Sequence, residues 1–165
     1  MPRAVRRGRG PRVTAIRSSK AARARGSRAG LAAERHCVVL PQLKHLDYWN
    51  LHRVADIFLD TIGWSSGGSV FEAVACRVPV VTIPGELMRS RQGYAILSQL
   101  GVTDTIARDG NHYVEIAVRL AEDLSFREDL VGRMVLGFPG LYSDNRGVGA
   151  LEEFLIKAIR KQASR

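Results

Sequence analysis

The sequence has few of the residues that mark secreted, metal-binding or membrane proteins. It contains only two cysteines, Cys37 and Cys76, each in an apolar run, which favours free thiols in a reducing cytoplasm over a disulfide. Its four histidines are not paired with the cysteines at zinc-site spacing, so we expect no metal site and no cofactor. No apolar stretch approaches the roughly 20 residues that cross a bilayer, and the start of the chain lacks a signal peptide. We therefore expect a cytoplasmic protein without a membrane partner.

Acidic residues are scarce at the amino terminus. Residues 1–35 hold 11 of the 25 Lys and Arg residues but one of the 16 acidic residues, so the remaining 14 basic and 15 acidic residues nearly balance. This segment cannot bury enough apolar surface to offset its ordering entropy, so we expect a disordered basic arm over residues 1–28. Its charge would attract nucleic acid, but no aromatic residue lies between the basic ones to stack with bases. We expect no specific nucleic-acid partner.

The body of the chain alternates short apolar runs with helical patterns. Strands are expected at residues 36–40, 55–60, 78–83 and 104–107, and helices at 45–54, 69–76, 87–100 and in three later segments. Short strands that are apolar throughout are typical of a parallel sheet covered on both faces, and their crossovers are right-handed. The expected fold class is α/β, a doubly wound parallel Rossmann-like sheet within one domain at residues 29–165.

Local signals also predict two boundaries among the later helices. Ser125 and Glu128 have the spacing of a capping box that would open one helix. Pro139 and Gly140 would end that helix, since a proline cannot donate a backbone hydrogen bond.

The stretch "TIGWSSGGSVFEAVACRVPVVTIPG", residues 61–85, places small polar residues between an expected strand and an expected helix. One interpretation is local: Ser69 caps the helix and Glu72, three residues later, completes a capping box. That leaves Gly67 and Gly68 unexplained, and consecutive glycines let a backbone approach a bulky anion closely. Ligands of such sheets bind at the carboxyl ends of the strands. The spacing matches neither the dinucleotide fingerprint nor the P-loop, so a turn and a phosphate cradle both stay open.

Several sequence blocks occur together in a specific order: "LP-x-L-x-H-x-x-Y", "AD-x-x-LD", "GWS-x-G", "P-V-V-T-x-PG" and "YV-x-x-A-x-x-LA". With them, residues 29–161 resemble the carboxyl-terminal, donor-binding half of the bacterial O-linked N-acetylglucosamine transferase-like family, the SPINDLY-type glycosyltransferases with tetratricopeptide repeats. The resemblance implies the carboxyl-terminal half of a GT-B fold, followed by helices. It also implies inverting transfer of a sugar from a UDP-N-acetylglucosamine-like donor to protein or glycan hydroxyls.

The resemblance further implies a UDP-sugar site. Small residues at a helix start would hold the diphosphate, and an acid in the first turn would contact the ribose. The loop after the first strand would touch the uracil, and a segment after the third strand would line the same crevice. In that order, these residues are Gly67, Gly68 and Ser69; Glu72; Leu43, His45 and Tyr48; and Pro84, Gly85 and Arg91. The resemblance assigns no catalytic residue.

The chain departs from the family pattern in three places. Gly68 stands where the family usually has Asn or Thr, Val70 where it has Thr, and Gln92 where a histidine is frequent. Neither repeats nor a second Rossmann-like half are recognisable, so we expect a fragment whose partner is a separate amino-terminal half or a repeat protein. Two alternatives stay open: a non-catalytic nucleotide-sugar-binding remnant, and a non-specific nucleic-acid binder that acts through the arm.

Overall fold

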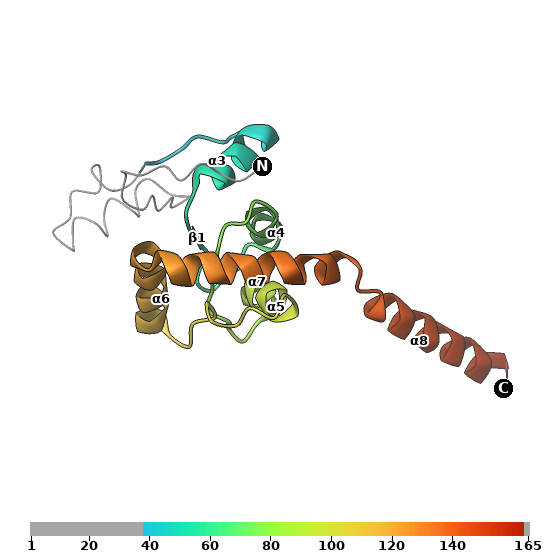
Figure 1. Ribbon diagram of the computed structural model, residues 1–165. Coiled ribbons are helices and arrows are strands. Elements are labelled where there is room, and N and C mark those ends of the chain that lie inside the picture. Colours follow the sequence, from blue (N-terminus) through green and yellow to red (C-terminus); the bar gives the residue numbers. More distant parts are fainter. Residues whose placement is uncertain (1–37, 164–165) are drawn as a thin grey trace.

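The structure, a computed structural model, describes residues 38–163 (Figure 1). The expected arm at residues 1–28 and the first residues of the expected domain lie outside this range. Val38 and Val39 belong to the first expected strand but have no regular structure and are exposed. The strand prediction is wrong for residues 38–40, because an apolar run becomes a strand only where a partner strand accepts its hydrogen bonds.

Two short parallel strands form the sheet of the described residues. β1 (Phe58–Leu59) pairs with β2 (Val80–Val81), so that Phe58 lies opposite Val80. An isolated parallel bridge joins Thr82 to Ile106. The strands lie inside the predicted ranges 55–60 and 78–83 but are shorter, and the strand predicted at 104–107 is reduced to the bridge.

Helices make up most of the described chain. They are α3 (His45–Val54), α4 (Gly67–Ala75), the 3-10 turn η1 (Met88–Ser90), α5 (Gln92–Gln99), α6 (Gly110–Glu122), α7 (Leu124–Tyr142) and α8 (Arg146–Ala163). The long helix α7 lies across α4 and α5 and meets α6 at its start, whereas α8 extends away from the body (Figure 1). The fold is thus mainly helical around a small parallel sheet, and the complete doubly wound sheet stays a prediction.

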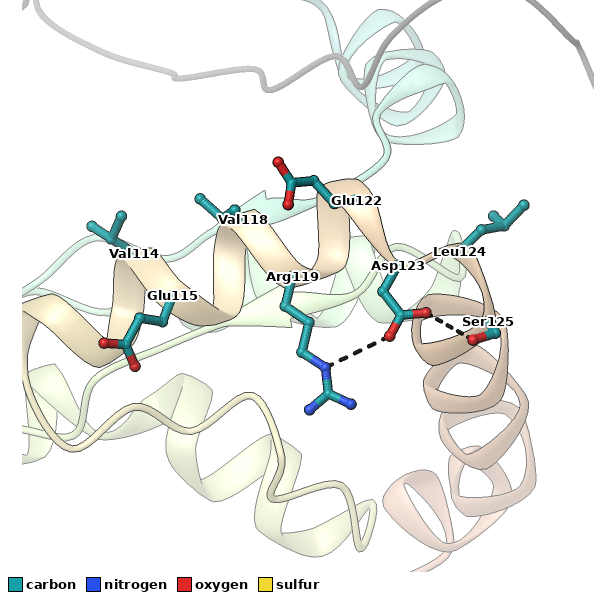
Figure 2. Close-up of a pocket in the computed structure, with 8 residues that line it drawn as sticks. All are labelled: Val114, Glu115, Val118, Arg119, Glu122, Asp123, Leu124 and Ser125. Carbon is teal, nitrogen blue, oxygen red and sulfur yellow. Dashed lines mark hydrogen bonds and ion pairs between the residues drawn. The ribbon is translucent and has the colours of Figure 1, made fainter.

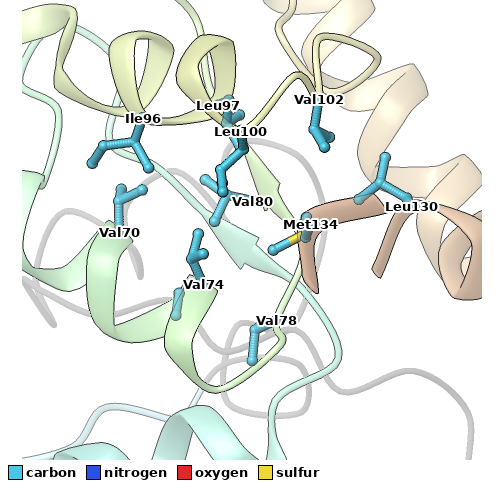
Figure 3. Packing of buried hydrophobic residues seen from close by; sticks show 11 residues of the cluster. Val70, Val74, Val78, Val80, Ile96, Leu97, Leu100, Val102, Leu130 and Met134 are labelled. Carbon is cyan, nitrogen blue, oxygen red and sulfur yellow. The ribbon is translucent and has the colours of Figure 1, made fainter. Parts of the chain in front are cut away.

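Apolar side chains cover both faces of this sheet. Val80 belongs to a buried cluster that α4, α5 and α7 complete, where Leu97 and Met134 are at most 1% exposed (Figure 3). Its neighbour Val81 belongs to a second cluster, which Leu120 of α6 completes. Successive side chains of a strand point to opposite faces, so two adjacent valines suffice to anchor helices on both sides.

The predicted boundaries of α7 are wrong at both ends. Asp123 caps the helix by accepting a hydrogen bond from the Phe126 N–H (2.9 Å), and Ser125 donates to Asp123 instead of capping. Pro139 lies inside α7, which continues to Tyr142. A proline removes one backbone hydrogen bond, and here the residues around it, Phe138 and Leu141, pack against the first core cluster and hold the last turn.

Removing the side chain of Leu97 should test this core. Leu97 is 0% exposed, so Leu97→Ala should lower the free energy of unfolding by about 2 to 5 kcal/mol, since it removes apolar contacts and leaves a cavity. Leu136 is 82% exposed, and Leu136→Ala should cost less than about 0.5 kcal/mol. The measurement is denaturant unfolding of both variants. Equal losses would contradict the assignment of the core.

Candidate functional site

Hydrogen bonds join the two loops that follow the carboxyl ends of β1 and β2. The Ser65 N–H in the first loop donates to the carbonyl of Arg89 in the second (2.8 Å). The Gly93 N–H at the start of α5 donates to Ser65 Oγ (2.7 Å). Helices α4 and α5 therefore begin side by side at the sheet edge where ligands of parallel α/β folds bind.

A buried carboxylate organises this edge. Asp60 follows β1 directly and is 3% exposed. Its Oδ1 accepts hydrogen bonds from the N–H groups of Thr61 (3.0 Å) and Ser66 (2.8 Å). Its Oδ2 accepts from the hydroxyls of Ser65 (2.6 Å) and Thr82 (2.8 Å). These four hydrogen bonds offset the free-energy cost of removing the carboxylate from water. They also connect the carboxyl ends of both strands through Asp60.

Two further contacts close the space around Asp60. A Cβ atom at Gly93 would lie 2.6 Å from Asp60 Oδ2, so only glycine fits there. The Tyr113 hydroxyl of α6 donates to the Asp60 carbonyl (2.8 Å). Burial, and then the Asp60 carboxylate, raise the pKa of Tyr113, so this hydroxyl stays a neutral donor at physiological pH. Sequence reasoning did not assign Asp60 to the site; the available signal was an acid at the end of an apolar strand.

Helix α4 begins earlier than its sequence predicts. Its first residue is Gly67, and Ser66 at the N-cap makes no side-chain capping bond. Ser69 thus lies in the first turn and does not cap, so the predicted Ser69–Glu72 capping box is wrong. The physical reason is Asp60, which already holds the Ser66 N–H and so starts the helix two residues sooner.

The first turn of α4 presents backbone donors without partners. The first helical hydrogen bond runs from the Val70 N–H to the Ser66 carbonyl (2.9 Å). The N–H groups of Gly67, Gly68 and Ser69 precede it, and none of them donates a hydrogen bond within residues 38–163. Such groups at a helix start, with the helix dipole behind them, are suited to an anion.

Helix α3 brings part of the predicted uracil region to α4. Nδ1 of His45 lies 3.8 Å from Oε1 of Glu72, so these two predicted site residues meet. The ring of Tyr48 packs edge-on against the ring of His52 (4.7 Å between centroids). Leu43 is half-buried just before α3.

The predicted residues after β2 form a compact turn. Nη1 of Arg91 donates to the Gly85 carbonyl (3.0 Å), and its guanidinium lies 4.7 Å from the centre of the Tyr94 ring. A Cβ atom at Gly85 would overlap the hydroxyl of Ser90. Pro84 is half-buried beside this turn. Arg91 is exposed and its charge has no carboxylate partner in residues 38–163.

A separate groove lies between α6 and the start of α7. It has a volume of about 790 Å³ and contains none of the predicted site residues (Figure 2). Val114 and Val118 line it from α6, and the charge of Arg119 is already paired with Asp123 (3.8 Å). Within residues 38–163, no group of three or more potential metal ligands is present, and no helix has the length and apolarity to cross a membrane.

Truncating the buried carboxylate should test its organising role. Asp60→Ala should lower the free energy of unfolding by roughly 3 kcal/mol or more, because each buried donor left unpaired costs about 1 to 3 kcal/mol. Asp104 is a matched control at the surface, paired with Arg133 at 2.7 Å, and Asp104→Ala should cost about 1 kcal/mol or less. Chemical denaturation measures both. A loss for Asp60→Ala no larger than the control's would refute the role.

His52 should make the stability pH-dependent. It is 2% exposed, its Nε2 has no partner in the described chain, and burial lowers its pKa below 6.5 although Glu72 acts in the opposite sense. As the pH falls, His52 is protonated in the unfolded state before it is protonated in the folded state. The contribution of neutral His52 to the free energy of unfolding is therefore complete above about pH 6.5 and is lost as the pH falls through the folded-state pKa. His52→Phe should flatten the decrease in unfolding free energy from pH 7 to 5. Identical pH profiles for His52→Phe and the unchanged protein would contradict this prediction.

Comparisons with known proteins agree with the resemblance. The profile of glycosyl transferase family 41 matches residues 19–136. The chain is similar to the probable UDP-N-acetylglucosamine--peptide N-acetylglucosaminyltransferases SPINDLY of Petunia hybrida (30% identity over 101 residues) and Oryza sativa subsp. japonica (31% over 104 residues). These matches cover 61% and 62% of this chain but 11% of each relative.

A solved structure is similar as well. A mutant of the Thermobaculum terrenum O-GlcNAc transferase aligns with a TM-score of 0.71 and 28% sequence identity. The alignment covers 87% of this chain and 27% of that one. This chain thus corresponds to the carboxyl-terminal glycosyltransferase region of these proteins. The predicted resemblance to this glycosyltransferase family is confirmed. The chain belongs to glycosyl transferase family 41.

Proposed function

We propose that the domain binds a UDP-sugar donor of the UDP-N-acetylglucosamine type at the edge where α4 and α5 begin. The observation that carries the proposal is the set of three unpaired N–H groups, from Gly67, Gly68 and Ser69, at the start of α4. They suit the diphosphate of the donor, because a helix start binds phosphate without any basic side chain. Membership of a glycosyltransferase family supports the same ligand class.

The other predicted residues have chemically sensible roles around that position. Glu72 accepts hydrogen bonds from the ribose hydroxyls. Its contact with His45 (3.8 Å) supports placing the uracil against Leu43, His45 and Tyr48. Pro84, Gly85 and Arg91 line the opposite side of the crevice.

The proposed reaction is inverting transfer of the sugar to a protein or glycan hydroxyl. The N–H groups of α4 would stabilise the departing UDP, and the positive charge of Arg91, which no carboxylate of residues 38–163 neutralises, would add to this from the turn after β2. We assign no catalytic base within this chain. Precise positioning of an acceptor can supply roughly 7 to 11 kcal/mol of the barrier, and we propose that a separate amino-terminal half or a repeat protein supplies it. The domain would comprise residues 29–165 behind a basic arm at 1–28, in the cytoplasm, without a cofactor.

A non-catalytic nucleotide-sugar-binding remnant is the second candidate. Gly68 and Val70 stand where the family usually has hydroxyl or amide side chains, so fewer side-chain donors reach the diphosphate. Binding would then depend mainly on backbone N–H groups. A non-specific nucleic-acid binder is the third candidate, and its arm lies outside the described residues.

The donor site predicts selective binding of UDP. The double variant Ser69→Ala and Glu72→Ala should bind UDP more weakly by roughly 1 to 3 kcal/mol, because hydrogen bonds to charged groups are lost. The matched control is Ser125→Ala with Glu128→Ala, the same residue types and spacing at the start of α7, which should bind UDP normally. Isothermal titration calorimetry with UDP, UMP and ATP measures the affinities. Equal or undetectable binding of all three nucleotides would remove the proposal.

A further inference from the structure

Gln92, the first residue of α5, reaches across to the start of α4. A Cβ atom at Gly67 would overlap the carboxamide oxygen of Gln92, so the space that glycine leaves open is occupied by this side chain, and a half-turn of its last torsion brings the NH₂ group to the same place. Gln92 itself is exposed to solvent. Its carboxamide therefore lies beside the first residue of α4, at the surface and not in the core.

The backbone of Gln92 is held in place by the Asp60 network. Asp60 accepts the hydroxyl proton of Ser65 (2.6 Å), and Ser65 Oγ in turn accepts the Gly93 N–H (2.7 Å). Gly93 is buried and cannot take a side chain without meeting Asp60. The residue before it is thereby fixed relative to the start of α4, and only the side-chain torsions of Gln92 remain free to adjust.

The carboxamide of Gln92 has the chemistry to complete an anion site. It carries two N–H donors and one acceptor oxygen on a neutral group, and turning its last torsion exchanges them. The neighbouring Arg91 is differently engaged, since its guanidinium holds the Gly85 carbonyl and stacks with Tyr94. Gln92 is thus the side chain beside Gly67 that is available to donate toward a ligand at the first turn of α4.

We propose that Gln92 is a further binding residue of the donor site, donating a side-chain N–H to the diphosphate held at the start of α4. This inference rests on the proposed function. The contact is to substrate, so removing it should weaken diphosphate binding and leave nucleoside binding unchanged.

The test compares Gln92→Glu and Gln92→Ala in the full chain by titration calorimetry with UDP and with uridine. Gln92→Glu keeps the shape but cannot donate and repels the diphosphate, so the affinity for UDP should fall more than about tenfold. Gln92→Ala should bind UDP about three- to tenfold more weakly. The affinity for uridine should not change in either variant. A glutamate in the first turn of a helix is favourable, so Gln92→Glu should melt no lower than the unchanged protein.

Ser98→Glu is the matched control for charge. Ser98 is exposed near the other end of α5. The Ser98→Glu variant therefore adds the same negative charge to the helix at a distance from the site, and its UDP affinity should be unchanged. Normal UDP affinity in Gln92→Glu, or equal losses for UDP and uridine, would overturn the assignment of Gln92 while leaving UDP binding intact. Absence of UDP binding in the unchanged protein would instead remove the proposed function and this inference with it.

Discussion

The buried carboxylate of Asp60 is the constraint on which the proposed donor site depends. It accepts the Ser66 N–H, and so sets where α4 begins. Through its bond to the Ser65 hydroxyl it also sets where α5 begins, because Ser65 Oγ holds the Gly93 N–H. The first residues of these helices, Gly67 and Gln92, are 25 positions apart in the sequence. Asp60 thereby holds the two helix starts side by side.

This arrangement makes the proposed site largely a matter of backbone. The donors at the first turn of α4 are N–H groups, which glycine supplies as well as threonine does. Gly68 can therefore stand where the family usually has a polar side chain without removing a backbone donor. Because few side-chain donors contribute, the site depends on the two loops holding the backbone N–H groups in the correct positions. The hydrogen bond from Ser65 to Arg89 (2.8 Å) and the bonds to Asp60 provide that rigidity.

The small sheet can support this edge because helices bury both of its faces. Val80 and Val81 are fully buried in different clusters, so each strand residue contributes to one of two cores. Buried apolar side chains on both faces are the pattern of parallel sheets. The proposed donor site lies at the carboxyl ends of these strands, whereas the groove between α6 and α7 contains none of its residues.

Local sequence by itself determined the features that depend on neighbouring residues. The helical patterns predicted helices in the later part of the chain, the apolar runs predicted β1 and β2, and the Gly-Ser cluster predicted a special turn between a strand and a helix. The resemblance added the family and a set of proposed site residues, of which Glu72 and His45 lie 3.8 Å apart.

Only the tertiary structure decided which local signals prevailed. Residues 38–40 have no partner strand among residues 38–163, Pro139 stays helical because its neighbours are packed, and the capping boxes predicted for α4 and α7 are replaced by other contacts. At α4 the competing group is Asp60, whose donors come from the loop after β1 and from Thr82, directly after β2. A hydrogen bond between residues 22 positions apart leaves no periodicity in the sequence, so its effect appears only once the strands are paired.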